Sequence, residues 1–220
     1  MSRRRFADRR AAGRALAERL SGAPPEGMVG LGLPRGGVVV AAEVAAVLGA
    51  PLDVLVVRKL GLPWQPELAM GAIAAVGDGV ETVRVASVLA AAGVDEDTFE
   101  RVRQQELTEL RRREAAYRDG RPALAVAGRA VVVVDDGLAT GATLRAAVLA
   151  VRRQQPTRVT AAVPVGSPRA CAATAADVDE LVCLSAPHSF RAVGQAYGDF
   201  SATTDEEVRA ALARARPGSS

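Results

Sequence analysis

The sequence has few aromatic residues, few cysteines and a single histidine. Phe, Trp and Tyr together make up 3% of its 220 residues, and the one histidine is His188. The two cysteines, Cys171 and Cys183, lack the close pairing that zinc-ligating cysteines usually show. We therefore do not expect a structural zinc site.

Long apolar runs are also missing, since none reaches the ~18 residues that span a bilayer. The best candidate, residues 38–57, is interrupted by Glu43 and Asp53. The N-terminal segment MSRRRFADRR has basic residues but no apolar core behind them, which a secretory signal requires. These features predict a soluble protein of the reducing cytoplasm.

Lysine is almost absent from the chain. Of 28 basic residues only Lys59 is a lysine, and the 25 acidic residues leave a net charge of +3. This charge is too small and too dispersed for the basic stripe that is typical of nucleic-acid binding. Codon bias explains the excess of arginine, but it also draws attention to the single position that kept a lysine.

Apolar runs alternate with helical patterns along the chain, which predicts a doubly wound α/β domain with a parallel sheet. One strand–helix–strand unit spans residues 28–60, and a second spans residues 129–165. Between them we expect a mobile loop from residue 61 and a hairpin turning at Gly77-Asp78-Gly79. Further helices are expected at 7–20, 95–118, 167–176 and 205–215, and a further strand at 179–185.

The segment VVVVDDGLATGAT, residues 131–143, carries the strongest functional signal. Four β-branched residues predict a strand buried on both faces. Asp135 and Asp136 follow at its carboxyl end, where open parallel sheets bind ligands. The loop beyond them leads directly into a helix, whose free N–H groups and the hydroxyls of Thr140 and Thr143 suit a phosphate. A ribose phosphate fits this combination better than an ordinary strand–helix turn does.

This segment resembles the signature with which type I phosphoribosyltransferases bind 5-phosphoribosyl 1-diphosphate (PRPP). The resemblance implies that Asp135 and Asp136 hold the ribose hydroxyls and meet Mg²⁺ indirectly, through those hydroxyls or water. The loop that would hold the 5-phosphate consists of Ala139, Thr140, Gly141, Ala142 and Thr143. Family members that act on 6-oxopurines often have an aspartate where this chain has Ala139, so the pattern is closer to adenine- and orotate-type enzymes.

A second motif, GLPRGGVVVA at residues 32–41, is a glycine-rich turn between the first strand and its helix. On its own such a turn is often only a helix start, although glycines let a backbone approach an anion closely. By resemblance it is the pyrophosphate loop, formed by Arg35, Gly36 and Gly37. The family often has a non-proline cis peptide there, which we expect within these three residues.

Basic residues follow at the exit of the second strand, where Arg58 and Lys59 lie in the segment VVRKLGLP. This segment is similar to the corresponding one in adenine phosphoribosyltransferases, which implies that both cations stabilise the charge of the departing pyrophosphate. The alternative is two cations at a strand end that extend into solvent. The loop after them, with Trp64 and Glu67, would be the catalytic flap, and Glu67 a proton-transfer group.

The acceptor side is expected in a C-terminal hood over residues 185–200. Phe190 is the candidate for stacking the base, with Tyr197 and Phe200 as alternatives. His188 is a candidate general base, although a surface or capping histidine is more common.

The resemblance implies a single phosphoribosyltransferase domain over residues 1–220. Its core would cover about 28–200, its flap about 61–95, and its hood about 185–200 with the N-terminal helix. The implied enzyme is a homodimeric, Mg²⁺-dependent pentosyltransferase of nucleotide salvage, which moves phosphoribose from PRPP to a nitrogenous base.

Three alternatives stay open at this point. The chain could be a PRPP-binding regulator without transferase activity, or a transferase of specialised metabolism with an unusual acceptor. A phosphohydrolase would need further acidic residues at other strand ends, and the sequence shows no such set.

Overall fold

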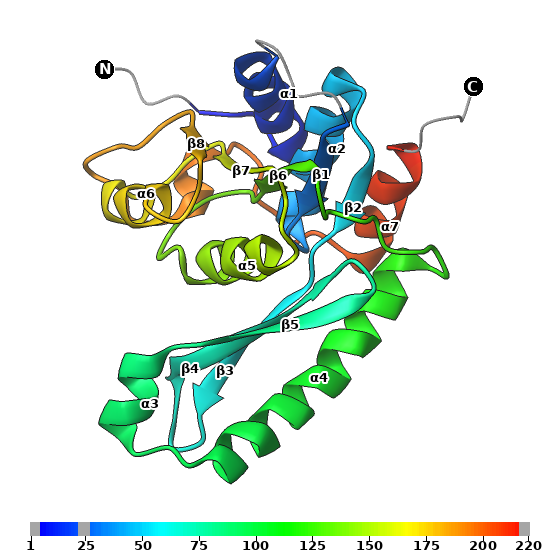
Figure 1. The fold of residues 1–220 in the computed structure, drawn as a ribbon. Coiled ribbons are helices and arrows are strands. Elements are labelled where there is room, and N and C mark those ends of the chain that lie inside the picture. The colour runs from blue at the N-terminus through cyan, green and yellow to red at the C-terminus, as the bar shows by residue number, and fades with distance from the viewer. Residues whose placement is uncertain (1–4, 22–26, 216–220) are drawn as a thin grey trace.

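The computed structural model describes residues 5–21 and 27–215, and it contains a parallel five-stranded sheet flanked by helices (Figure 1). The strands lie in the order β2 (Leu52–Val54), β1 (Val29–Gly32), β6 (Ala130–Val134), β7 (Arg158–Val163) and β8 (Glu180–Cys183). All neighbouring pairs are parallel. The expected α/β class and its doubly wound parallel sheet are confirmed.

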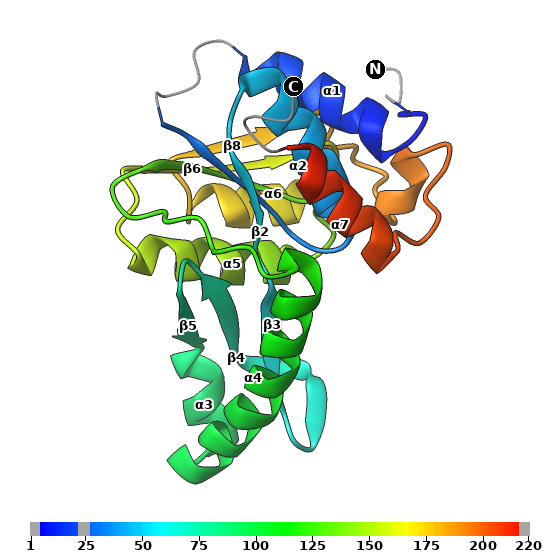
Figure 2. The same cartoon turned by 90° about the vertical axis from the view of Figure 1, so that its right-hand side faces the viewer.

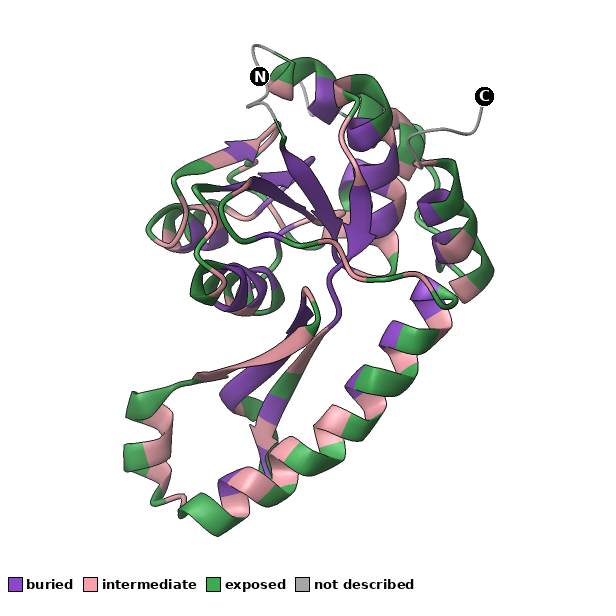
Figure 3. Ribbon diagram, turned by 45° about the vertical axis from the view of Figure 1, so that its right-hand side comes forward, coloured by how far each residue is buried: buried purple, intermediate pink, exposed green. Residues whose placement is uncertain are grey.

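Helices cover both faces of this sheet. One face packs against α1 (Arg9–Leu20), α2 (Gly36–Leu48) and α7 (Asp205–Arg214), and the other against α5 (Ala142–Arg153) and α6 (Pro168–Ala175). In β6, Val131 and Val133 point to the α5 side, whereas Val132 and Val134 point to the α2 side. Because all four are buried, the two-faced burial predicted for this strand is confirmed (Figure 3).

The segment 51–60 was expected to form one strand, and that expectation is wrong. Its first part is β2 of the parallel sheet, but from Val57 the chain enters β3 (Val57–Leu62), which belongs to a separate antiparallel sheet. The crossing residues Leu55 and Val56 are buried. An unbroken apolar run therefore hid the change of sheet from the sequence pattern.

The second sheet is part of an arm, residues 57–118, that projects from the central sheet (Figures 1 and 2). Its strand β4 (Gln65–Val76) pairs with β3 and with β5 (Gly79–Arg84). The turn at residues 77–79 is confirmed. The mobile loop expected from residue 61 is instead a paired hairpin, with register shifts around Gly61. A short helix, α3 (Ala86–Ala92), was not predicted.

The arm ends in α4 (Glu96–Arg118), which the sequence predicted, and a buried ionic network anchors it to the central sheet. Arg118 lies 3.0 Å from the Asp53 carboxylate of β2 and also pairs with Glu114. A run of four charged residues, 111–114, lies on this helix, and its last member, Glu114, is buried at 8% exposure. It is buried because it shares Arg118 with Asp53.

The segment between β8 and α7 contacts the N-terminal part of the chain. A short 3₁₀ helix, η1 (Val193–Ala196), precedes Tyr197, which forms a bridge with Phe6 and so joins the segment before α7 to the segment before α1. Within the part of the chain that the structure describes, every helix is too short or too polar to cross a membrane.

Removing one partner of the buried network should destabilise the fold strongly. Asp53→Ala would remove one of the two carboxylates that pair with Arg118 and leave the backbone N–H groups of Val54 and Leu124 without their acceptor. We expect a loss of about 3–5 kcal/mol in the free energy of unfolding, measured in urea.

The matched control is Glu96→Ala, which removes an ion pair with Arg84 at the surface. The side chain of Glu96 is 67% exposed and that of Arg84 is 44% exposed. That change should cost less than about 1 kcal/mol. Equal losses in the two variants would contradict an anchoring role for the buried network.

Candidate active site

Two motifs about a hundred residues apart meet at the carboxyl edge of the parallel sheet. Asp135 and Asp136, the acid pair, directly follow β6. The glycine loop, residues 34–37, connects β1 to α2 beside them. A Cβ on Gly37 would lie 2.8 Å from the Val134 carbonyl oxygen and 3.0 Å from the Asp135 carboxylate. A Cβ on Gly36 would overlap the Asp136 carboxylate. Only glycines allow this close packing.

The glycine loop contains the non-proline cis peptide that the resemblance implies, but one bond earlier than expected. The cis bond joins Pro34 to Arg35 and does not lie within Arg35-Gly36-Gly37. The side chain of Arg35 is half exposed and extends toward Asp205 of α7, at 4.0 Å.

The threonine loop, residues 139–143, follows the acid pair and leads into α5. Gly141 adopts a left-handed conformation with φ of 81° directly before the helix, which turns the chain into it. Thr140 and Thr143 are exposed on either side of the buried Gly141. The first N–H groups of α5 thus have no earlier helical turn to bond and face this loop, as an anion-binding helix start requires.

Asp136 is held by residues from both ends of the chain. Its carboxylate accepts a hydrogen bond from Nε of Arg9 at 2.8 Å, and its carbonyl accepts one from the hydroxyl of Tyr197 at 2.5 Å. Arg9 also lies 4.1 Å from the centre of the Phe200 ring. Arg9 was not among the predicted site residues, because nothing in its local sequence pattern separates it from the other N-terminal arginines.

Asp135 has a different environment from its neighbour. Its carboxylate accepts the backbone N–H of Asp136 at 2.8 Å, but no cation pairs with it among the described residues. Burial and the adjacent charge of Asp136 raise the pKa of Asp135 well above its ordinary value. An unpaired, partly buried carboxylate of this kind carries an electrostatic cost that a ligand can relieve.

The two basic residues of the arm face opposite sides of its sheet, because successive side chains of a strand alternate. Arg58 points toward α4, where its guanidinium donates to Glu106 at 2.6 Å. Lys59 shares its face with Val57, which packs with the α5 cluster. Lys59 is exposed and forms no ion pair with any residue that the structure describes. Of the two predicted cations, only Lys59 is therefore available to a ligand.

The predicted flap residues lie in the β3–β4 hairpin of the arm. Trp64 is 61% exposed, and Glu67 is also exposed. No hydrogen bond or ion pair of the described residues links Glu67 to the acid pair. Glu67 is thus not joined to the acid pair, the glycine loop or the threonine loop by any of these contacts.

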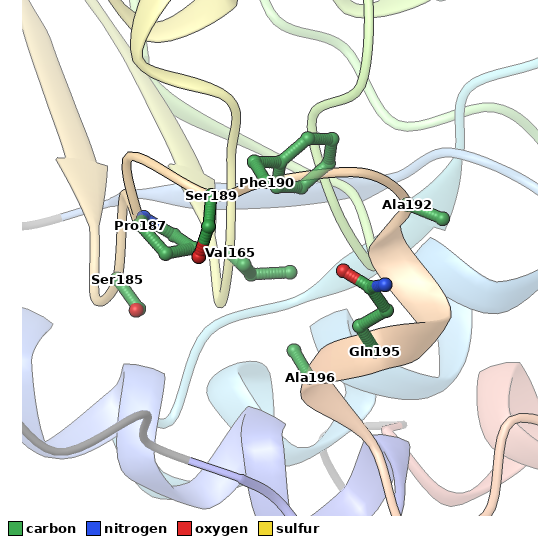
Figure 4. Close-up of a pocket in the computed structure, with 8 residues that line it drawn as sticks. All are labelled: Val165, Ser185, Pro187, Ser189, Phe190, Ala192, Gln195 and Ala196. Atoms are coloured by element: carbon green, nitrogen blue, oxygen red, sulfur yellow. The ribbon is translucent and has the colours of Figure 1, made fainter.

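The hood contains a small pocket beside the acid pair's edge of the sheet (Figure 4). The ring of Phe190 borders it, and none of its lining side chains is charged. The lining residues are Val165, Ser185, Pro187, Ser189, Phe190, Ala192, Gln195 and Ala196. His188 is exposed and does not line this pocket.

The other two stacking candidates have structural partners. Tyr197 is 2% exposed and stacks on Phe200, with 5.0 Å between the ring centres. Because Tyr197 also bonds Asp136, its ring supports the acid pair and cannot offer a free face to a base. Phe190 is the remaining aromatic residue of the hood pocket.

The fold and these paired motifs define a class, the type I phosphoribosyltransferase fold. Residues 7–198 match the family described as the phosphoribosyl transferase domain, and the chain belongs to this family. The resemblance seen in residues 131–143 is therefore confirmed.

Two similar proteins extend this assignment. A Mycobacterium tuberculosis protein, provisionally named as a phosphoribosyl transferase, is 49% identical over 212 residues, which are 96% of this chain and 47% of that protein. The chain thus spans about half the length of this curated relative. The crystal structure of TT1426 from Thermus thermophilus is 50% identical with a TM-score of 0.85, and the match covers 94% of this chain and 97% of that one.

Replacing Asp135 by asparagine should stabilise the protein. The folded-state pKa of Asp135 is raised, so its ionised form costs stability at pH values above the unfolded pKa, and protonation removes this cost as the pH falls. Asparagine keeps the acceptor for the N–H of Asp136 and removes the charge. At pH 7 we expect Asp135→Asn to gain about 1 kcal/mol and a higher Tm in thermal unfolding.

The gain should shrink in acid, where the wild-type carboxyl is protonated. Asp199→Asn serves as the control, because hydrogen bonds from Ser201 lower the pKa of Asp199. It should lose stability at pH 7, not gain it. A Tm of Asp135→Asn below that of the wild-type protein at pH 7 would contradict the claim that the ionised Asp135 carboxylate costs stability.

Proposed function

We propose that this chain transfers the 5-phosphoribosyl group of PRPP to a neutral nitrogenous base and releases pyrophosphate. The observation that carries the proposal is the packing of Gly36 and Gly37 against Asp135 and Asp136 at the head of the threonine loop. This packing gathers hydroxyl acceptors, an anion-binding helix start and an open backbone loop at one edge of the sheet.

The proposed roles follow from the chemistry of each group. The acid pair accepts hydrogen bonds from the two ribose hydroxyls, and the residues of the threonine loop, Ala139 to Thr143, bind the 5-phosphate. Arg35, Gly36 and Gly37 lie along the pyrophosphate. Arg9 keeps the Asp136 carboxylate oriented and compensates its charge at 2.8 Å, so that both acids can sit side by side.

In the proposed reaction, a ring nitrogen of the base attacks C1 of the ribose while the bond from C1 to the pyrophosphate oxygen breaks. Negative charge grows on the departing pyrophosphate, and a fixed cation stabilises it more in the transition state than in the ground state. Lys59 is the unpaired cation available for this task. Arg58 acts indirectly, since its ion pair with Glu106 holds β3 on α4.

Mg²⁺ fits the donor set, provided that the substrate supplies most of its ligands. The described residues contain no cluster of three or more acidic, histidine or cysteine side chains that could hold a metal. Magnesium typically binds through one or two carboxylates together with substrate oxygens and water, and the acid pair offers such carboxylates. When bound with PRPP, the ion would neutralise pyrophosphate charge.

The hood pocket supports a neutral acceptor. Phe190 offers an aromatic face, and Ser185 and Gln195 offer hydrogen-bonding groups without net charge. A carboxylate-bearing base would be desolvated there without a cation to compensate it. The pocket therefore favours an adenine-like base over orotate. Of the two enzyme types with which Ala139 is compatible, adenine-type and orotate-type, we propose the first.

The proposal also includes its setting. PRPP is a cytoplasmic metabolite, so we place the activity in cytoplasmic nucleotide salvage. The exposed Trp64 and Leu68 on the projecting arm support a homodimer, in which a second copy would cover them.

The direct test is pyrophosphate release from PRPP with a panel of purine and pyrimidine bases. We expect turnover with a neutral base and none with orotate. Asp135→Asn/Asp136→Asn should abolish turnover, and unchanged turnover in this variant would refute the proposal. PRPP binding in calorimetry without any turnover would favour the regulatory alternative.

Lys59 gives a second prediction. Lys59→Ala should lower kcat by about 100-fold, because one charge-stabilising donor is lost. Lys59→Arg should lower it too, since a planar guanidinium does not replace a compact ammonium.

The matched control is Arg58→Lys on the other face of the same strand, which keeps the charge beside Glu106 and should change kcat far less. Steady-state kinetics on all three variants check this. Equal kcat in Lys59→Arg and wild type would remove Lys59 from the proposed catalytic set.

A further inference from the structure

Two cysteines meet directly beneath the threonine loop. Cys171 lies in α6 and Cys183 is the last residue of β8, yet their Sγ atoms are only 3.6 Å apart. Both are free thiols and both are partly exposed. A disulfide requires about 2.05 Å between the sulfurs, so the pair needs only a small approach to form one.

The two thiols differ in reactivity. The hydrogen bond between the two sulfurs lowers the pKa of Cys171. Contact with Cys171 and burial raise the pKa of Cys183. Cys171 is accordingly the attacking thiol and Cys183 the resolving one.

The dithiol touches the backbone that supports the proposed PRPP site. A Cβ on Gly166 would lie 2.5 Å from the sulfur of Cys171, so this thiol packs on the Gly166 backbone itself. Gly166 bridges to Leu138, and the neighbouring Ser167 donates hydrogen bonds at 2.8 Å to the carbonyls of Leu138 and Ala139. Residues 166–167 thereby fix the start of the threonine loop.

The same dithiol reaches the hood pocket. The Cys183 thiol donates to the carbonyl of Ser185 at 3.2 Å, and this carbonyl also accepts the N–H of Gly166 at 3.0 Å. Ser185 lines the pocket beside Phe190. One pair of sulfurs thus contacts both Gly166, which supports the threonine loop, and Ser185, which lines the hood pocket.

We propose that Cys171 and Cys183 form a reversible disulfide that displaces residues 166–167 and weakens PRPP binding at the threonine loop. The effect on PRPP rests on the proposed function. The Cys171 sulfur packs directly on the Gly166 backbone, so closing the sulfur distance from 3.6 Å by about 1.5 Å changes the contact that supports residues 166–167. Displacements of about 1 Å at a binding constellation are enough to weaken it substantially.

The oxidant is a low-molecular-weight disulfide. The Cys171 thiolate attacks one of its sulfurs, the small S–S bond breaks, and one small thiolate leaves. Cys183 then loses its proton, attacks the sulfur of Cys171 and displaces the second small thiolate. Two protein thiols are oxidised and one small disulfide is reduced to two thiols, which take up the two protons.

The experiment treats the wild-type protein with glutathione disulfide and then with dithiothreitol. Thiol titration, the loss of two hydrogen atoms in intact mass and a peptide map identify the bond between Cys171 and Cys183. Calorimetry measures PRPP affinity in each state. We expect the oxidised protein to bind PRPP about tenfold more weakly, with recovery after reduction.

Cys171→Ser is the matched control, since it lacks the attacking thiol and should keep its PRPP affinity under oxidation. Cys183→Ser should stop at the mixed adduct of Cys171, which intact mass detects, and should form no internal disulfide. If either variant fails to fold, the proposal is tested by the reversible change in the PRPP affinity of the wild-type protein. Mixed adducts without an internal disulfide would overturn the proposal, as would a disulfide that leaves PRPP affinity unchanged.

A failure of the proposed function is distinguishable. If the reduced protein does not bind PRPP, hydrogen exchange of residues 138–143 in the two redox states still measures the coupling. Faster exchange in the disulfide state would support the displacement, and identical exchange would refute it.

Discussion

The structure depends on the close packing of a glycine backbone against two neighbouring carboxylates. Gly36 and Gly37 leave no room for a side chain above Asp135 and Asp136. This packing buries negative charge, and Arg9 compensates only the Asp136 part of it. The partly buried charge on Asp135 is a cost to stability, and costs of this kind are typical of functional sites.

The central sheet and the arm position different residues of the candidate site. The sheet fixes the acid pair, the glycine loop and the threonine loop on one rigid edge, as parallel α/β sheets do at their carboxyl ends. The arm presents Lys59 from a different sheet and is fastened by the buried contact between Arg118 and Asp53. The position of Lys59 relative to the acid pair thus depends on an ion pair outside the site.

Sequence patterns predicted the elements of the central sheet, and residues 131–143 predicted the family, because both are encoded in short contiguous segments. They missed the division at Leu55, since burial continues across it and apolar periodicity does not report which sheet a strand joins. They also missed Arg9, whose role exists only because the N-terminal helix folds back onto the edge of β6. The paired cysteines were visible in the sequence, but not the 3.6 Å between their sulfurs.

The convergence of Arg9, Tyr197 and Phe200 on Asp136 has a consequence for the newly made chain. The acid pair and both loops are synthesised well before Tyr197 leaves the ribosome. Until then Asp136 lacks its hydrogen bond from the Tyr197 hydroxyl. The strands of the central sheet can pair as residues emerge, but the contacts around Asp136 are completed only when residues 197–200 have left the ribosome. A nascent chain that stops before residue 197 would therefore hold the acid pair without the contact from Tyr197.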